Sequence, residues 1–194
     1  CGLPVAARLF ELLADAAGVG IECFPLVAEG ADVEAGTAVL EIEGPARAVL
    51  AGERTALNFV MLLSGIATEA RRWQRAAGSG LAVCDTRKTV PGLRALSKYA
   101  VRVGGAYNHR AGLHDMVLIK DNHVDFAGGI SQAIEACHQY LKHKGIRLMI
   151  EIETRNLSEV QQVIDHGGVN HALGYFFGTL GDQHDRSSRS LALG

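Results

Sequence analysis

The chain has 194 residues, of which 48% are hydrophobic and 21% charged, and its formal net charge at pH 7 is -2. This length allows one or two domains with a buried core, and the composition is typical of a soluble globular protein. The charge balance gives no basis for a nucleic-acid or membrane-surface partner, and no apolar run reaches the roughly 18 residues that span a bilayer. The cysteines at positions 1, 23, 84 and 137 lack CxxC spacing, which favours buried, reduced thiols over a zinc or redox site.

The first part of the chain predicts a helix followed by two short extended segments. Apolar residues recur at helical spacing over residues 4–17, with a proline in the first turn and Gly18 at the C-terminal end. Residues 20–27 and 38–43 read as extended pieces separated by glycine-containing turns. The chain begins with Cys1 and shows no signal-peptide pattern, which suggests a fragment whose N-terminus lies upstream.

Residues 47–77 have a helical pattern. The Ser64-Gly65 pair predicts a break, and hence two helices. The apolar spacing places three side chains of this segment in the core: Leu57, Met61 and Ile66.

The pattern of apolar and polar residues changes at the Gly-Ser-Gly of residues 78–80, where we place a domain boundary. Beyond it, short apolar runs alternate with helical patterns, which is typical of βαβ units and of a parallel sheet. Such repeats indicate a doubly wound sheet or an α/β barrel. The predicted strand and helix pairs are 81–85 with 92–103, 116–120 with 130–144, and 147–153 with 157–166.

The periodic pattern ends near Asn170. Residues 171–177 are too short to classify, although they could act as a strand, and 178–194 read as a polar, disordered tail. The domain prediction is therefore 1–78, then 79–170, then a tail of 171–194.

Charged side chains gather where each predicted strand ends, which is where parallel α/β folds place their function. Arginine forks and lysine point charges at one edge suit a small, multiply anionic ligand. Glu151 and Glu153 share a face of their strand, and such a pair beside an anion makes sense if a divalent metal bridges carboxylate and phosphate. The cationic candidates are Arg87, Lys88, His109, Arg110 and Lys120.

Purely structural interpretations remain open for these residues. Asp85 could pair with Arg87 across a loop, and Lys120 could pair with Glu153 to cap a barrel layer. His123 and the remaining histidines lack metal-ligand spacing such as HExxH and fit surface or capping positions.

The same segments resemble a family signature. ERTALN at residues 53–58 and SGIAT at 64–68 are similar to a stretch of the quinolinate phosphoribosyltransferases, also called nicotinate-nucleotide pyrophosphorylases (carboxylating). Further matches follow in the family's order over residues 2 to about 170: DTRKT with PGLR (85–94), KYAV with GG and NHR (98–110), LIKDNH (118–123) and IEIE (150–153).

The resemblance implies an α/β fold in which an N-terminal α/β sandwich domain precedes an open α/β barrel, here incomplete. It implies transfer of ribose 5-phosphate from phosphoribosyl pyrophosphate to quinolinate, with loss of pyrophosphate and carbon dioxide, to give nicotinate mononucleotide. It also implies Mg²⁺ as cofactor, a homodimer or higher oligomer, and a cytoplasmic location, or a plastid one in a plant or alga.

Residue roles follow from the matched motifs. Arg54 would reach into the neighbouring subunit's site. Arg87, His109 and Arg110 would grip the quinolinate dicarboxylate, while Lys88 and Lys120 would face both substrates. Glu153 would help to hold the magnesium and the ribose, and with the two lysines forms the predicted catalytic set.

After Asn170 the sequence no longer resembles the family, where a strand ending in a ribose-binding aspartate is expected. The abrupt change suggests a truncation, frameshift or alternative splice, and predicts that this polypeptide turns over poorly. Two alternatives remain: a paralogue of the molybdenum-operon ModD type, and a non-catalytic product that dimerises with full-length subunits.

Overall fold

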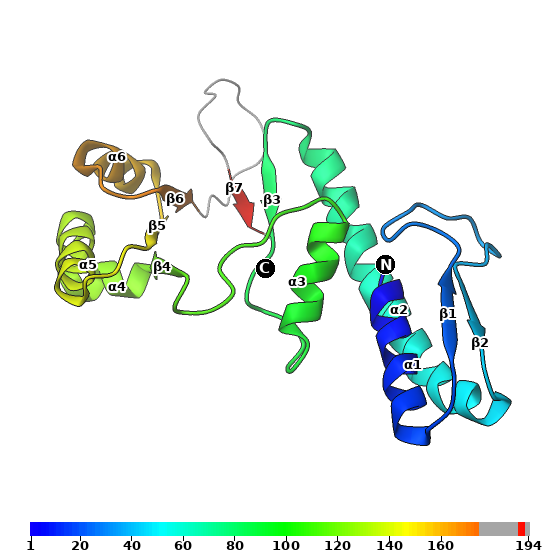
Figure 1. The fold of residues 1–194 in the computed structure, drawn as a ribbon. Helices are drawn as coiled ribbons and strands as arrows, with labels where there is room; N and C mark the ends of the chain where they lie inside the picture. Colours follow the sequence, from blue (N-terminus) through cyan, green and yellow to red (C-terminus); the bar gives the residue numbers. More distant parts are fainter. Residues whose placement is uncertain (175–189, 193–194) are drawn as a thin grey trace. The chain divides into compact units, whose positions relative to one another are not determined.

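The computed structural model describes residues 1–174 and 190–192. The chain forms two compact units (Figure 1). Unit 1 contains Cys1–His109 and the strand β7 (Ser190–Ala192), and unit 2 contains the described residues from Arg110 to Gly174. The predicted boundary at residues 78–80 lies inside unit 1 and stays a prediction.

Unit 1 begins with helix α1 (Leu3–Ala17), which packs along helix α2 (Ala46–Ala77) (Figure 1). Between them in sequence, β1 (Glu22–Pro25) and β2 (Leu40–Glu43) form an antiparallel pair. Ala6 and Phe10 of α1 and Ala56 of α2 form the centre of a core that the hairpin helps to cover. The predicted helix and extended segments are therefore confirmed.

Helix α2 is one continuous helix of 32 residues, so the predicted break at Ser64-Gly65 is wrong. A glycine inside a helix costs only about 1 kcal/mol relative to alanine. Here the packed face continues through the glycine, because Leu63 and Ala67 on either side of it are both buried.

The core prediction for α2 is wrong at two of its three positions. Leu57 and Met61 are 42% and 67% exposed, whereas Ile66 is half-buried. Among the described helices, α2 is long and apolar enough to cross a membrane. It packs against α1, α3 and β3 and carries Glu53 and Arg54 in its apolar stretch, so we assign it to the folded unit.

The second half of unit 1 is built on the end of α2. Strand β3 (Ala82–Cys84) pairs in parallel with β7, and helix α3 (Arg94–Val103) packs against α2. The two helices approach closely at Gly104, where a Cβ atom would lie 2.4 Å from the carbonyl oxygen of Ala67. Gln74 of α2 holds β3, because its Oε1 accepts from the Val83 amide at 2.9 Å and its Nε2 donates to Leu81 O at 2.8 Å.

Unit 2 is a parallel sheet in the order β4-β5-β6 with helices packed on it. Its elements are β4 (Met116–Ile119), α4 (Asp121–Ala127), α5 (Ile130–Lys144), β5 (Met149–Thr154), α6 (Leu157–His166) and β6 (His171–Gly174). Ile119, Ile150 and Ile152 of the sheet pack with Ile134 of α5 and Val163 of α6. The predicted βαβ alternation is confirmed, and α4 is the one described helix here that the pattern did not predict.

Disorder was predicted for residues 178–194, and it is wrong for the short segment that forms β7. Residues 171–177 were left unclassified, with a strand as one possibility, and the first four of them form a strand. His171–Gly174 forms β6, which pairs in parallel with β5, and Ser190–Ala192 forms β7. The strand edge of β5 provides the physical reason, since an unpaired edge is a template for another strand. Residues 175–189 and 193–194, where the rest of the prediction falls, lie outside the described residues.

Candidate functional site

Asp85 is the centre of a hydrogen-bonded group at the end of β3. Its side chain is 9% exposed, and its Oδ1 lies 2.5 Å from Nζ of Lys98 on α3, whose side chain is 7% exposed. The same Oδ1 accepts from the His109 amide at 2.9 Å. The predicted alternative of an Asp85–Arg87 pair is therefore replaced by a buried pair with Lys98.

Arg87 and Lys88 lie on the loop that follows Asp85. The loop is shaped locally, because the Lys88 amide donates to Thr86 Oγ1 at 3.1 Å and the Thr89 amide donates to Arg87 O at 3.0 Å. Arg87 is half-buried, and its Nε is a buried donor without a hydrogen-bond partner among the described residues. Buried donors are rarely left unpaired, so this guanidinium is a good candidate for ligand binding.

His109 joins the same end of unit 1. The segment before it runs beside β3, since Tyr107 N donates to Val83 O at 2.8 Å and Asp85 N donates to Tyr107 O at 3.0 Å. The structure therefore brings three of the five predicted cations, Arg87, Lys88 and His109, to one end of unit 1.

Arg110 belongs to unit 2 and opens a tight loop. The amides of Ala111 and Gly112 donate to Asp115 at 2.6 and 2.9 Å, and these two bonds hold the pKa of Asp115 below its usual range. Arg110 Nη1 donates to Met116 O at 3.4 Å, at the first residue of β4. Within unit 2 this contact lies at the opposite end of β4 from Lys120.

Lys120 and Glu153 lie at the C-terminal edge of the unit 2 sheet. Ile119 of β4 is in register with Ile152 of β5, which brings the next residues, Lys120 and Glu153, to the same edge. Because Ile150 and Ile152 face the helices, Glu151 and Glu153 point to the other face of the sheet. Both glutamates are buried, at 6% and 9% exposure.

The chain turns directly from Lys120 into α4. Lys120 is the N-cap residue, and its amide donates to Nδ1 of His123 at 3.0 Å. This bond confirms the capping role predicted for His123, and it leaves the exposed Lys120 side chain at the strand end.

Arg54 is exposed on α2, three and seven residues before the exposed Leu57 and Met61. Residues at this spacing share one face of a helix. Its predicted reach into a neighbouring subunit stays a prediction.

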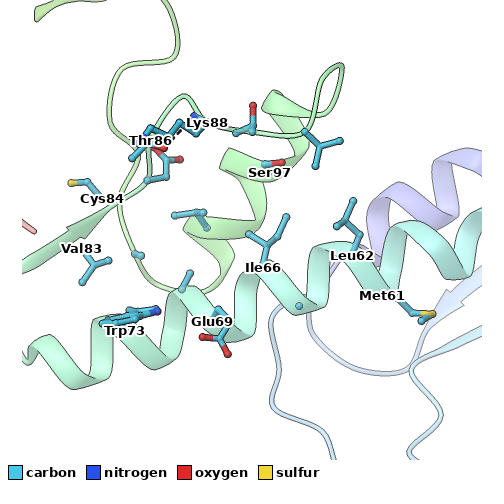
Figure 2. A pocket seen from close by; sticks show the side chains of 17 residues that line it. Met61, Leu62, Ile66, Glu69, Trp73, Val83, Cys84, Thr86, Lys88 and Ser97 are labelled. Atoms are coloured by element: carbon cyan, nitrogen blue, oxygen red, sulfur yellow. Dashed lines mark hydrogen bonds between the residues drawn. The ribbon is translucent and has the colours of Figure 1, made fainter. Parts of the chain in front are cut away.

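A cavity of about 690 Å³ lies between α2, α3 and the end of β3 in unit 1. Leu62 and Ile66 rise from α2 toward α3, and Thr86 and Lys88 lie across from them on the loop after β3 (Figure 2). Among the described residues of the lining, Lys88 is the one cation, whereas Glu69 and Asp85 are acidic, and most of the others are apolar. Lys88 lies at the polar end of this cavity, with Thr86 and Thr89.

Among the residues that the structure describes, no group of three His, Cys, Asp or Glu side chains could hold a metal by itself. Mg²⁺ commonly uses one or two carboxylates and completes its shell with water and substrate phosphate. Glu151 and Glu153 on one face of β5 fit that donor set.

Sequence reasoning gave no role to Lys98 and Asn108. In the orientation that satisfies its amide, Asn108 Nδ2 donates to Asp85 Oδ2 and to Lys98 O at 2.9 Å each. The available signal was weak: Lys98 lies between Ser97 and Ala100 on the buried face of α3, where a lysine needs a partner.

Two family models match the chain. The N-terminal domain of quinolinate phosphoribosyl transferase matches residues 1–64, and its C-terminal domain matches residues 66–171.

Named relatives agree with these models. A probable nicotinate-nucleotide pyrophosphorylase [carboxylating] from Synechocystis sp. is 49% identical over 164 residues, which is 84% of this chain and 53% of the relative. The chloroplastic nicotinate-nucleotide pyrophosphorylase [carboxylating] of Arabidopsis thaliana is 44% identical over 71% of this chain and 39% of its own length.

A solved structure, the nicotinate-nucleotide pyrophosphorylase from Francisella tularensis, aligns with a TM-score of 0.82 at 35% identity, covering 92% of this chain and 61% of that one. The predicted fold class, an α/β sandwich domain followed by part of an α/β barrel, is confirmed by this likeness. The chain spans about half the length of the curated relatives that it matches. Across residues 1–64 and 66–171, this chain belongs to the quinolinate phosphoribosyl transferase family.

Proposed function

We propose that this chain binds quinolinate and carries part of the site for phosphoribosyl transfer. The reaction transfers ribose 5-phosphate from phosphoribosyl pyrophosphate to quinolinate, and gives nicotinate mononucleotide, pyrophosphate and carbon dioxide. The observation that carries the proposal is the buried Nε of Arg87, which has no hydrogen-bond partner among the described residues, at the end of unit 1 where Lys88 and His109 also lie. Family membership supplies the substrate class.

The cations would act through charge and position. An arginine fork at Arg87 matches a planar carboxylate bidentately, whereas Lys88 and Lys120 act as point charges. Quinolinate carries two carboxylates, and pyrophosphate leaves with further negative charge. Arg87, Lys88 and His109 in unit 1, and Arg110 and Lys120 in unit 2, are the cations proposed to neutralise this charge, which is electrostatic rather than covalent catalysis.

Mg²⁺ is expected to arrive with phosphoribosyl pyrophosphate. Glu153, with Glu151 on the same strand face, would hold it, and phosphate oxygens would complete the shell. A bound Mg²⁺ ion would neutralise negative charge on the pyrophosphate as the pyrophosphate leaves.

A homodimer or higher oligomer is supported by the exposed stripe on α2. Leu50, Leu57 and Met61 are 66%, 42% and 67% exposed, and Arg54 lies among them at helical spacing. Burial of this stripe against a second copy would carry Arg54 to the partner. The relatives include a chloroplastic enzyme, and we expect this protein in the cytoplasm, or in the plastid if its source is a plant or alga.

Calorimetry of the 194-residue chain with quinolinate, and separately with phosphoribosyl pyrophosphate and Mg²⁺, tests the proposal. We expect quinolinate to bind more tightly, because its predicted contacts are present. Tight binding of phosphoribosyl pyrophosphate without any response to quinolinate would refute this assignment. It would instead favour the ModD-type paralogue.

A further inference from the structure

We propose that Asp85 and Lys98 are positioning residues, whose buried ion pair fixes His109 relative to the loop that carries Arg87 and Lys88. This inference rests on the proposed function for its meaning, but its geometry lies entirely in unit 1. It concerns groups that do not themselves touch the substrate.

The pair joins three segments of unit 1. Asp85 ends β3, Lys98 lies on α3, and their charged atoms are 2.5 Å apart at 9% and 7% side-chain exposure. The third segment is the loop at His109, whose backbone is held on both sides. The His109 amide donates to Asp85 Oδ1, and the His109 carbonyl oxygen accepts from Lys98 Nζ, each at 2.9 Å.

The charges of the pair are satisfied internally. Asp85 Oδ2 accepts from Asn108 Nδ2 at 2.9 Å, so both carboxylate oxygens have donors. Lys98 Nζ has two acceptors and little exposed surface, which removes it from the set of cations that could meet a substrate. Lys98 therefore differs from the exposed Lys88, although both lie in matched family motifs.

Stability alone is a poor explanation for such a pair. Buried ion pairs replaced by uncharged groups are often neutral or even stabilising, whereas removal of one partner is strongly destabilising. A site, by contrast, needs its groups held within a fraction of an ångström, and a misplacement of 1 Å can cost about a hundredfold in rate. Arg87 and Lys88 follow Asp85 by two and three residues, so the pair sets their distance from His109.

The test compares the full 194-residue chain with Lys98→Met and with the double variant Asp85→Asn/Lys98→Met. Three quantities are measured: the denaturant midpoint, hydrogen exchange of the His109 amide by NMR, and the quinolinate dissociation constant by calorimetry. Lys98→Met leaves a buried charge alone and should lower the midpoint. The double variant removes both charges and should recover most of that loss.

If the pair positions His109, the double variant should fold, but its His109 amide should exchange about tenfold faster than in the parent. Its dissociation constant for quinolinate should also be about tenfold higher. The Leu26 amide, which donates to Val39 O at 3.0 Å elsewhere in unit 1, should exchange at the parental rate. Lys142→Met, which changes an exposed lysine on α5, serves as the matched control.

Parental exchange at His109 and parental quinolinate affinity in the double variant would overturn the proposal. So would an equal rise in exchange at Leu26, because it would indicate general destabilisation. If the parent chain itself fails to bind quinolinate, the proposed function is wrong, and the two exchange rates alone decide the positioning role.

Discussion

The Tyr99 hydroxyl donates to Glu29 Oε1 at 2.7 Å and so ties α3 to the loop between β1 and β2. The same carboxylate accepts from the Gly2 amide at 2.6 Å and the Leu3 amide at 3.1 Å, at the first turn of α1. Burial tends to raise the pKa of Glu29, but these hydrogen bonds outweigh it and hold that pKa below its usual range. Burial and the bond to Glu29 also raise the pKa of Tyr99.

A carboxyl group with a lowered folded-state pKa stabilises the protein only while it is ionised. Its contribution is complete above the unfolded pKa of about 4.3, and is lost as the pH falls through the folded pKa. We therefore expect the free energy of unfolding of unit 1 to fall as the pH drops below about 4.3 and through the lower folded-state pKa of Glu29. Denaturant titrations across this range measure it.

Glu29→Gln should remove most of this pH dependence and cost about 1.5–3 kcal/mol at pH 7, the range for hydrogen bonds to a charged group. Glu34→Gln, an exposed change in the same loop, is the control and should behave like the parent. Equal acid sensitivity in the parent and Glu29→Gln would show that Glu29 does not carry the effect.

Two glycines near α2 should respond in opposite directions to alanine. Gly65 lies inside α2, and a Cβ there would meet nothing within 4 Å, so Gly65→Ala should stabilise by about 0.5–1 kcal/mol. A Cβ at Gly104 would lie 2.4 Å from Ala67 O, so Gly104→Ala should destabilise by about 1–3 kcal/mol. Urea unfolding midpoints report both, and a loss of stability in Gly65→Ala would contradict the continuous helix.

Local sequence patterns predicted the helices whose ends are marked by clear capping residues. Gly145 ends α5 in the left-handed conformation, and Asn156 caps α6 by accepting from the Glu159 amide, so both helices have the predicted bounds. Helix α4 escaped prediction because it is short and because its N-cap residue is Lys120, whose amide donates to His123, rather than a serine or threonine.

The sequence was enough to predict which residue types form the candidate site, but not which residues contact one another. Strand ends in a parallel fold indicated Arg87, Lys120 and Glu153. Whether a lysine is buried depends on a partner that only tertiary structure supplies: Lys98 meets Asp85 from a different element, thirteen residues away. The same limit explains Met61, whose apolar character suits a core position and an exposed stripe equally well.

Arg87→Lys should weaken quinolinate binding by about 1–3 kcal/mol, because lysine keeps the charge but loses the bidentate fork. Calorimetry measures the affinity, and circular dichroism checks the fold. Arg72→Lys is the matched control, since Arg72 is 76% exposed on α2 and pairs only loosely with Glu69 at 3.3 Å. Unchanged affinity in Arg87→Lys would mean that Arg87 is a structural strand-end residue.

Met61→Glu should shift the proposed oligomer toward monomer, because a charge would then be buried in the α2 stripe without a partner. Sedimentation velocity measures the distribution. Leu12→Glu, on α1 and 50% exposed, changes an apolar surface residue outside the stripe and should leave it unaltered. A parent chain that sediments as a monomer, or equal dissociation in both variants, would refute the assignment of this face.

The polypeptide of these 194 residues should bind quinolinate but form nicotinate mononucleotide at a rate far below that of a full-length relative. Catalysis requires both reactants in near-attack geometry, and this positioning supplies roughly 7–11 kcal/mol of the barrier reduction. The matched region ends at residue 171, and the chain spans about half the length of its relatives. Glu153, Lys88 and Lys120 would therefore have to hold the ribose and its phosphate with little further help.

The assay is nicotinate mononucleotide formation with Mg²⁺ and both substrates, run beside the full-length Synechocystis relative. A mixture of this chain with full-length subunits tests the non-catalytic alternative, because an inactive partner that joins their oligomer would change their rate.

Strand β6 already pairs with β5, so an exposed strand edge at β5 is not expected to limit the fold. The expected failure is instead chemical, since His171–Gly174 contains no acidic residue to take the place of the ribose-binding aspartate expected from the family resemblance. Turnover by this polypeptide alone at a rate near that of the relative would contradict the prediction, and would show that 194 residues hold both substrates.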